Sequence, residues 1–303
     1  MRPAILLTGA QGQLGFELRR ALSLLGDVTA LDRAALDVTD EAKIVQVMQA
    51  LRPRIVVNAA GYTAVDRAES DRELAHAVNA EGPALIAREA ARLGSLVIHY
   101  STDYVFDGAK EGWYQESDAP NPVSVYGQSK LDGERAVEVS GATHAIIRTS
   151  WVFGLHGSNF LKTIIGAARR RDALSIVADQ FGAPTPVHLI ADISAVMIAQ
   201  YLSAPEQFPS GVYHAAPAGE TTWFGYADHA LRLLRAKGVQ LCVSEDAVRP
   251  ISASEYSSAA PRPANSRLDT AKLCETFGIT LPAWERGVDY VIDQLVEAAQ
   301  LMA

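Results

Sequence analysis

Cysteine is almost absent from this 303-residue sequence, which contains only Cys242 and Cys274. Two thiols cannot build a disulfide framework, and their separation matches no metal-ligand spacing. No run reaches the ~18 consecutive apolar residues that a membrane-spanning helix requires. The N-terminus enters a short apolar run without the pattern of a signal peptide. We therefore expect a cytoplasmic protein with reduced thiols and no membrane contact.

An excess of basic residues is also missing. Lysine and arginine total 27 against 35 aspartates and glutamates, which gives a formal net charge of −8. Proteins that bind nucleic acids normally carry a concentrated basic face, so we expect no nucleic-acid partner. The seven histidines are scattered without ligand spacing, and we predict no bound metal. An anionic small molecule stays compatible with this composition because it needs only a few local cations or a helix N-terminus.

Short apolar runs alternate with amphipathic segments through the first half of the chain. Such runs are typical of parallel strands that are buried on both faces. The predicted strands span residues 4–7, 28–31, 55–58, 96–101 and 145–149. The predicted helices between them span residues 14–25, 41–51, 73–93 and 125–139. This alternation predicts an α/β fold with a doubly wound parallel sheet of the Rossmann type.

The pattern loosens after residue 150, where Gly, Asn, Pro and aromatic residues become frequent. We predict a dinucleotide-binding domain over residues 1–150 and a smaller C-terminal α/β substrate-binding lobe over residues 151–303. Elements around residues 189–214 are expected to return to the sheet. Residues 259–267 are rich in proline, lack periodicity and are predicted to form a surface loop. Helices are predicted at residues 159–170, 189–202, 222–237 and 284–302.

A glycine-rich segment joins the first predicted strand to the first predicted helix. Gly9, Gly12 and Gly15 form a GxxGxxG pattern, which allows backbone N–H groups to approach a pyrophosphate at the helix N-terminus. Asp32 follows the second strand, where a carboxylate accepts hydrogen bonds from ribose hydroxyls. Its neighbour Arg33 suits a 2′-phosphate instead. The sequence thus predicts NADH or NADPH as cofactor and leaves the choice open.

Tyr126 and Lys130 place a phenol and an ammonium at i and i+4 on one predicted helix. Hydride transfer to a carbonyl carbon leaves an alkoxide that needs a proton and hydrogen-bond donors. A neutral phenol can donate that proton, and a nearby lysine is expected to stabilise the phenolate and lower its pKa. Thr102 lies at the carboxyl end of the fourth predicted strand and is expected to donate to the same oxygen. The set predicts a carbonyl reductase.

Six motifs carry a more specific resemblance. In chain order they are NAAGYTAVD at 58–66, STDYVFDG at 101–108, YGQSK at 126–130, RTSWVFG at 148–154, DQFGAPT at 179–185 and RPANS at 262–266. Together, over nearly the whole chain, they closely resemble the dTDP-4-dehydrorhamnose reductases. Asp103 is followed by Tyr104 where nucleotide-sugar dehydratases carry an Asp-Glu pair, and this counts against elimination chemistry.

The resemblance implies a reductase that uses NADH or NADPH to convert the 4-keto group of dTDP-4-dehydro-L-rhamnose, a nucleotide sugar, into dTDP-L-rhamnose. It assigns catalysis to Thr102, Tyr126 and Lys130. The cofactor would contact Tyr126 and Lys130. It would also contact Gly9, Gln11, Gly12, Leu14, Asp32, Arg33, Asp37, Ala59, Ala60, Thr63 and Asn79. The substrate would contact Thr102, Asp103, Tyr104 and Trp151, and near its diphosphate Asn159, Asn265 and Ser266.

Two other functions share parts of this pattern. A nucleotide-sugar epimerase, or a reductase for another 4-keto sugar, has the same glycine segment and the same Tyr-Lys pair. A non-catalytic regulatory subunit on this fold has no need of Tyr126 and Lys130, so their presence favours an enzyme. The oligomeric state stays open, with a homodimer as one option.

Overall fold

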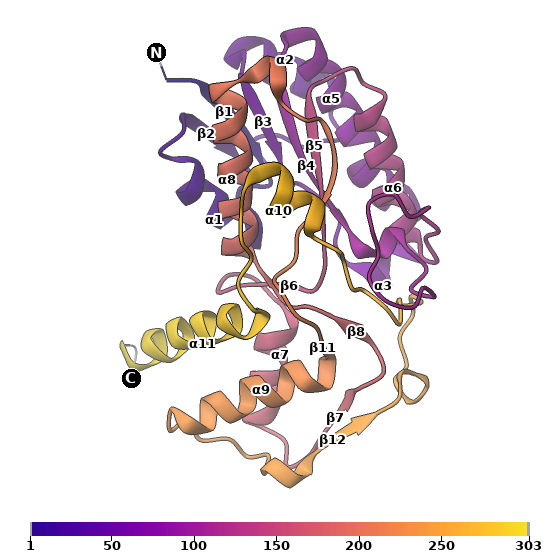
Figure 1. The fold of residues 1–303 in the computed structure, drawn as a ribbon, viewed down its shortest axis with the longest axis vertical. Coiled ribbons are helices and arrows are strands. Elements are labelled where there is room, and N and C mark those ends of the chain that lie inside the picture. Colours follow the sequence, from indigo (N-terminus) through magenta and orange to yellow (C-terminus); the bar gives the residue numbers. More distant parts are fainter. Residues whose placement is uncertain (1, 302–303) are drawn as a thin grey trace.

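A six-stranded parallel sheet forms the larger part of the molecule in the computed structural model, which describes residues 2–301 (Figure 1). Its strand order is β10-β5-β4-β3-β1-β2. The strands are β1 (Ala4–Thr8), β2 (Asp27–Leu31), β3 (Ile55–Asn58), β4 (Leu96–Thr102), β5 (His144–Thr149) and β10 (Gly211–His214). The predicted doubly wound parallel sheet is confirmed, and β10 brings residues from the second half of the chain into it.

Helices cover both faces of this sheet. On one face, α1 (Gln13–Leu22) and α8 (Val187–Ser203) pack side by side, and α10 (Ala271–Phe277) joins the same hydrophobic core. On the other face lie α2 (Glu41–Leu51), α5 (Gly82–Leu93) and α6 (Val125–Glu138). Strands with buried apolar side chains on both faces require such a double cover. The short helices α3 (Val65–Ala68) and α4 (Arg72–His76) precede α5.

A smaller lobe lies below the carboxyl ends of the strands (Figure 1). It contains α7 (Phe160–Ala168), α9 (Trp223–Ala236) and α11 (Trp284–Leu301), whose apolar sides share one hydrophobic cluster. Three small sheets complete it: β6 (Val152–Phe153) with β9 (Thr185–Pro186), β7 (Leu174–Val177) with β12 (Val248–Ile251), and β8 (Phe181–Gly182) with β11 (Thr221–Thr222). A domain boundary at residue 150 stays a prediction.

The point where the chain reverses its winding direction positions the site. β1 has β2 on one side and β3 on the other, so the connections leave their carboxyl ends toward opposite faces of the sheet. In open α/β sheets this arrangement leaves a crevice beyond the strand ends, where ligands bind. The loop after β1 and the loop after β3 border that crevice.

Two stretches differ from the sequence-based predictions. The helix predicted over residues 73–93 is interrupted by a π-helical turn at Ala77–Glu81, a local irregularity that apolar periodicity does not reveal. The predicted surface loop at residues 259–267 is wrong in part, because it enters the interior. Ala260, Asn265 and Ser266 are buried there.

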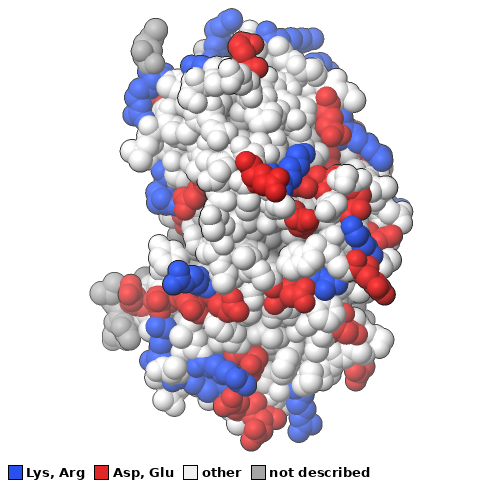
Figure 2. All heavy atoms as spheres, in the orientation of Figure 1, with Lys and Arg blue, Asp and Glu red and all other residues white. Residues whose placement is uncertain are grey.

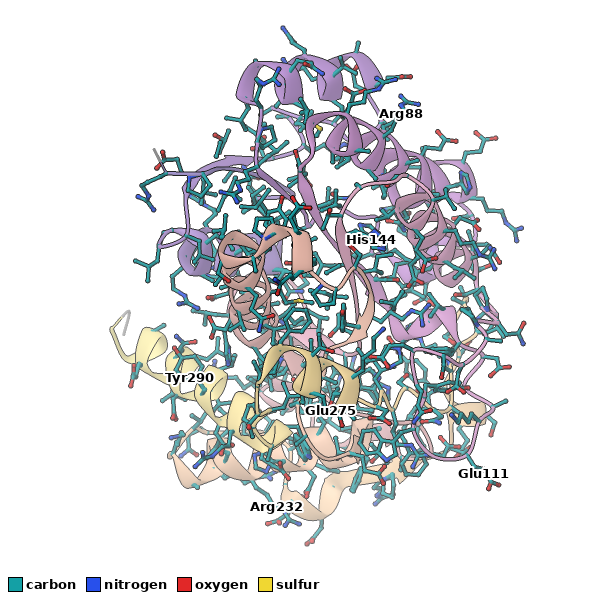
Figure 3. The ribbon with its side chains drawn as sticks, turned by 45° about the horizontal axis from the view of Figure 1, so that its top comes forward. Arg88, Glu111, His144, Arg232, Glu275 and Tyr290 are labelled. Carbon is teal, nitrogen blue, oxygen red and sulfur yellow. The ribbon has the colours of Figure 1, made fainter. Side chains whose placement is uncertain are left out.

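The surface carries charges of both signs. On the face shown in Figure 2, lysine and arginine side chains lie among aspartates and glutamates without a continuous basic area. Charged side chains such as Arg88, Glu111 and Arg232 point away from the body of the molecule (Figure 3). Between residues 2 and 301, no helix combines the length and the apolar character needed to cross a lipid bilayer.

Candidate active site

The glycine segment between β1 and α1 makes a turn that only glycine can occupy at two positions. Gly9 has a φ of +67°, and a Cβ there would lie 2.5 Å from the carbonyl group of Ala59. A Cβ on Gly15 would lie 2.2 Å from the carbonyl oxygen of Gly9. The close approach of these backbones leaves a cradle at the N-terminus of α1, which suits the pyrophosphate of a dinucleotide.

A first pocket opens between this cradle and the loops after β2 and β3. Eight of the predicted cofactor residues line it: Gly9, Gln11, Gly12, Asp32, Arg33, Asp37, Ala59 and Ala60. Its wall also contains residues that the sequence reasoning missed, namely Leu36, Val38, Gly61, Tyr62 and Val78. Its shape and its mixture of apolar walls with a carboxylate at the rim fit an adenosine group.

The rim of the first pocket carries both candidate selectors of the cofactor. Asp32 accepts hydrogen bonds from Gln11 Nε2 at 2.5 Å and from the backbone of Ala35 at 3.0 Å. Arg33 forms an exposed ion pair with Asp37 at 3.2 Å. Exposed pairs of this kind contribute about 0–1 kcal/mol, so the Arg33 guanidinium is available to another anion.

A second pocket continues from the first toward the carboxyl ends of β4 and β5. The predicted residues that line it are Gly12, Leu14, Ala59, Ala60, Thr63, Thr102, Asp103, Tyr104, Tyr126, Lys130 and Trp151. The lining residues that were not predicted as site residues are Gln13, Gly61, Val65, Tyr100, Ser101, Thr149, Val152, Ser158 and Ile190. Several of them lie within the six motifs, but a motif does not tell which of its side chains face a pocket, so only the folded chain identifies them.

Tyr126 and Lys130 meet in this second pocket on the first turns of α6. Ser124 caps the helix by accepting from the backbone of Gly127, which fixes where the helix begins. The Tyr126 ring packs edge-on against Tyr104, with ring centroids 5.5 Å apart. Burial raises the pKa of Tyr126 to about 12, while a hydrogen bond with Thr102 acts in the opposite direction. The phenol therefore stays protonated at neutral pH and suits a proton donor.

The surroundings of Lys130 act on its pKa in two opposite directions. Its Nζ donates to the backbone carbonyl of Tyr100 at 2.5 Å. Burial lowers the pKa of Lys130 to about 8, and the nearby carboxylate of Glu134 partly offsets this. The net pKa of Tyr126 is thus raised and not lowered as expected, because desolvation of the phenol is the largest effect on it.

Asn79 lines neither pocket, and its side chain connects two segments of the site. Its amide donates to the backbone carbonyl of Tyr62 at 2.9 Å and to Ser129 Oγ at 3.0 Å, and its Oδ1 accepts from the backbone of Tyr62. Asn79 lies in the π-helical turn and ties the loop after β3 to α6. Its contact with the cofactor stays a prediction.

Asn159 likewise supports the loops and does not line the two pockets. Its Oδ1 caps α7 by accepting from the backbone of Lys162, and its amide donates to Gln13 Oε1 at 2.9 Å and to Gly154. Because these contacts occupy both ends of its amide, Asn159 holds the start of α7 against α1. Its contact with the substrate diphosphate stays a prediction.

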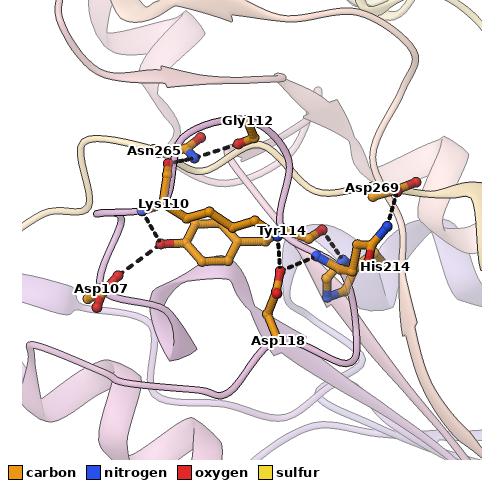
Figure 4. Close-up of polar contacts among 9 residues, drawn as sticks. Asp107, Lys110, Gly112, Tyr114, Asp118, His214, Asn265 and Asp269 are labelled. Carbon is orange, nitrogen blue, oxygen red and sulfur yellow. Dashed lines mark hydrogen bonds and ion pairs between the residues drawn. The ribbon is translucent and has the colours of Figure 1, made fainter.

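Asn265 fixes the loop that follows β4 (Figure 4). Its amide donates at 2.7 Å to the backbone carbonyls of Lys110 and Gly112, and its Oδ1 accepts from Arg267. The neighbouring Ser266 is buried and its hydroxyl acts on the Asp103 carboxyl. Neither residue lines the second pocket, and their predicted contact with the substrate diphosphate stays a prediction.

Trp151 lies between the second pocket and the smaller lobe. Its backbone has a φ of +48°, a strained conformation for a residue with a side chain. Its ring stacks on Trp223 with centroids 3.7 Å apart. Beyond Trp223 lies a third pocket, with apolar walls from Phe160 and Ile164 and a guanidinium from Arg262. Trp223 itself lines that pocket.

A metal centre is not apparent. Within residues 2–301 the structure brings together no group of three or more His, Cys, Asp and Glu side chains able to hold an ion.

Known proteins resemble the chain over nearly its whole length. A family model described as the RmlD substrate binding domain matches residues 1–297. A dTDP-4-dehydrorhamnose reductase from Burkholderia thailandensis is 45% identical over 294 residues, covering 96% of this chain and 99% of that protein. The enzyme of the same name from Salmonella typhimurium is 42% identical over 295 residues, covering 96% of this chain and 97% of that one.

Solved structures agree with the sequence comparison. The crystal structure of a dTDP-4-dehydrorhamnose reductase from Bacillus anthracis, in complex with NADP, superimposes with a TM-score of 0.86. It is 34% identical and covers 97% of this chain and 100% of that chain. The motifs, the two joined pockets and these matches lead to one assignment. The chain belongs to the dTDP-4-dehydrorhamnose reductase family of oxidoreductases.

Proposed function

We propose that the protein reduces the 4-keto group of dTDP-4-dehydro-L-rhamnose with NADPH or NADH and releases dTDP-L-rhamnose. The observation that carries the proposal is the convergence of Thr102, Tyr126 and Lys130 in one pocket that continues from the glycine cradle. The Bacillus anthracis relative, which was crystallised with NADP, supports the cofactor class.

The cofactor has a site that fits its parts. The cradle between Gly9 and Gly15 takes the pyrophosphate, and the first pocket takes the adenosine. Asp32 faces the ribose hydroxyls, while Arg33 is placed for a 2′-phosphate. When bound, the nicotinamide supplies the hydride that reduces the keto carbon. Lys130 holds its ribose from the second pocket.

Tyr126 completes the reduction by giving its proton to the keto oxygen as negative charge develops there. The keto group becomes a hydroxyl, and the phenolate that remains is stabilised by the positive charge of Lys130 one helical turn away. Because the pocket is buried, this charge acts in a medium of low dielectric constant and is weakly screened. A proton from solvent then restores the phenol.

The nucleotide part of the substrate would extend past Trp151 into the third pocket. Apolar walls from Phe160 and Ile164 suit a pyrimidine ring, and the Trp223 ring offers a stacking surface. Arg262 is half-buried and pairs with Asp66 at 3.1 Å, which leaves part of its guanidinium for the diphosphate.

Arg262→Ala should raise the KM for the nucleotide sugar by about 10-fold, because it removes one charge-assisted hydrogen bond to the diphosphate. The dissociation constant of NADPH should stay unchanged, since Arg262 does not line the first pocket. The matched control is Arg249→Ala, which removes an exposed arginine of β12. Equal effects of the two substitutions on KM would contradict the placement of the nucleotide.

The rate of reduction should fall as the pH rises through about 8, because Lys130 loses its proton there. Because the pKa of Lys130 is lowered to about 8, its side chain is fully protonated only at pH values well below 8. Lys130→Arg keeps its charge at all accessible pH values. In this variant the alkaline limb of the kcat–pH profile should therefore move to higher pH, even if kcat itself is lower. An unmoved limb would show that another group titrates.

The test of the proposed function is a steady-state assay of purified protein with dTDP-4-dehydro-L-rhamnose, following NADPH and NADH in parallel. Oxidation of one cofactor per molecule of dTDP-L-rhamnose formed would support the proposal. An epimerase, which returns its hydride to the sugar, would show no net oxidation. A regulatory subunit would bind the cofactor without turnover.

A further inference from the structure

The only proton of the Thr102 hydroxyl is engaged in the structure. It is donated to Asp103 Oδ1 at 3.0 Å, and the hydroxyl oxygen accepts from the backbone of Tyr104 at 3.2 Å. The phenol of Tyr126 lines the same pocket. A threonine hydroxyl has one proton and two lone pairs. Because the proton points at Asp103, Thr102 does not offer it to the second pocket.

Asp103 is placed to control this arrangement. It follows Thr102 directly, lines the second pocket and is 2% exposed. No lysine, arginine or histidine within residues 2–301 forms an ion pair with it. Burial raises the pKa of Asp103 to about 6, while hydrogen bonds from Ser266 and Thr102 act in the opposite direction. The titratable and charged groups around it or its neighbours are Tyr104, Tyr126, Lys130, Asp66 and Arg262.

We propose that Asp103 sets the direction of the Thr102 hydroxyl, and that its protonated form turns this hydroxyl toward the keto oxygen of the substrate. This inference rests on the proposed function. A protonated Asp103 donates its O–H to the Thr102 oxygen, which has a second lone pair beside the one that the Tyr104 N–H uses. The Thr102 proton then points into the pocket, where the phenol of Tyr126 is the other donor.

The consequence is a site with two donors for the developing alkoxide when Asp103 is protonated. Removing one donor of this kind typically costs about 10²–10³ in kcat. No net proton is consumed by the reorientation, because Asp103 keeps its proton while Tyr126 supplies the one that the product carries. Asp103 is thus a positioning residue that acts through Thr102.

The test compares kcat at about pH 5.5 and about pH 7.5 for the wild-type protein and three variants, and a carboxyl that titrates near 6 should give a ratio of at least about 10 in the wild type. Asp103→Asn replaces the carboxyl by an amide whose N–H donates to Thr102 at every pH, so the ratio should collapse toward 1. Thr102→Val should also flatten the ratio, because Asp103 then has no hydroxyl to direct. Thr102→Ser should retain it.

Several outcomes would overturn the inference. A wild-type ratio near 1, or a ratio that persists in Thr102→Val, would show that Asp103 does not act through this hydroxyl. A thermal unfolding curve shows whether Asp103→Asn folds. If it does not fold, the Thr102→Val variant still tests the inference. Wild-type protein that binds NADPH but reduces no nucleotide sugar at either pH would overturn the proposed function and the inference together.

Discussion

Tyr126→Phe is expected to lower kcat for reduction of the keto sugar by about 10²–10⁴, the usual contribution of a general acid. The substitution removes only the hydroxyl that donates the proton, and the ring keeps its edge-on contact with Tyr104. The dissociation constant of NADPH should change little, because the glycine cradle and the first pocket are untouched. Stopped-flow measurement of NADPH oxidation checks the rate, and fluorescence titration checks the binding.

The matched control is Tyr213→Phe, which removes another buried phenol far from the reacting atoms. Tyr213 donates to the backbone carbonyl of Pro209 at 2.5 Å and lies on β10 in the core. This variant should lose about 1 kcal/mol of stability and keep its turnover. A Tyr126→Phe variant that retains near-normal turnover would remove Tyr126 from its role as proton donor.

Glu134→Ala should lower the free energy of unfolding by about 3–5 kcal/mol, because it leaves the Arg148 guanidinium buried without its counter-charge. Glu134 lies on α6 and Arg148 on β5, and their side chains are 1% and 4% exposed. The guanidinium meets the carboxylate through two nitrogens, at 2.9 Å and 2.6 Å. This pair joins the catalytic helix to the sheet. Urea unfolding followed by circular dichroism measures the loss.

The exposed pair between Arg88 and Glu41 provides the control for this prediction. Glu41→Ala should cost less than about 1 kcal/mol, since solvent screens an exposed pair. A loss in Glu134→Ala as small as that in Glu41→Ala would mean that water reaches Arg148. Because the carboxylate of Glu134 also acts on Lys130, the variant should show an alkaline limb displaced toward lower pH.

Local patterns in the sequence were sufficient to predict the parallel sheet, the glycine cradle and the pair formed by Tyr126 and Lys130. The predicted helix at residues 41–51 and strand at residues 55–58 coincide with α2 and β3, because caps and apolar runs mark their limits. The glycines after β1 and the Tyr-Lys pair on α6 were found for a similar reason. Each carries its chemistry within a few consecutive residues.

The supporting contacts could not be predicted because they join distant segments. Asn265 was expected at the substrate, yet it binds backbone carbonyls more than 150 positions earlier in the chain. The strand-end hydroxyl of Thr102 was expected to serve the substrate, and its orientation toward Asp103 depends on how deeply that carboxyl is buried. Spacing in a sequence gives neither burial nor the direction of a proton.

The central claim is that the chain transfers hydride to C4 of a dTDP-linked 4-keto sugar. The most direct measurement uses NADPH that carries deuterium at the transferable position, with dTDP-4-dehydro-L-rhamnose as substrate, and analyses the product by mass spectrometry and NMR. Our account predicts dTDP-L-rhamnose with one deuterium at C4 and one oxidised cofactor for each product molecule. Unlabelled sugar with the cofactor still reduced would contradict it.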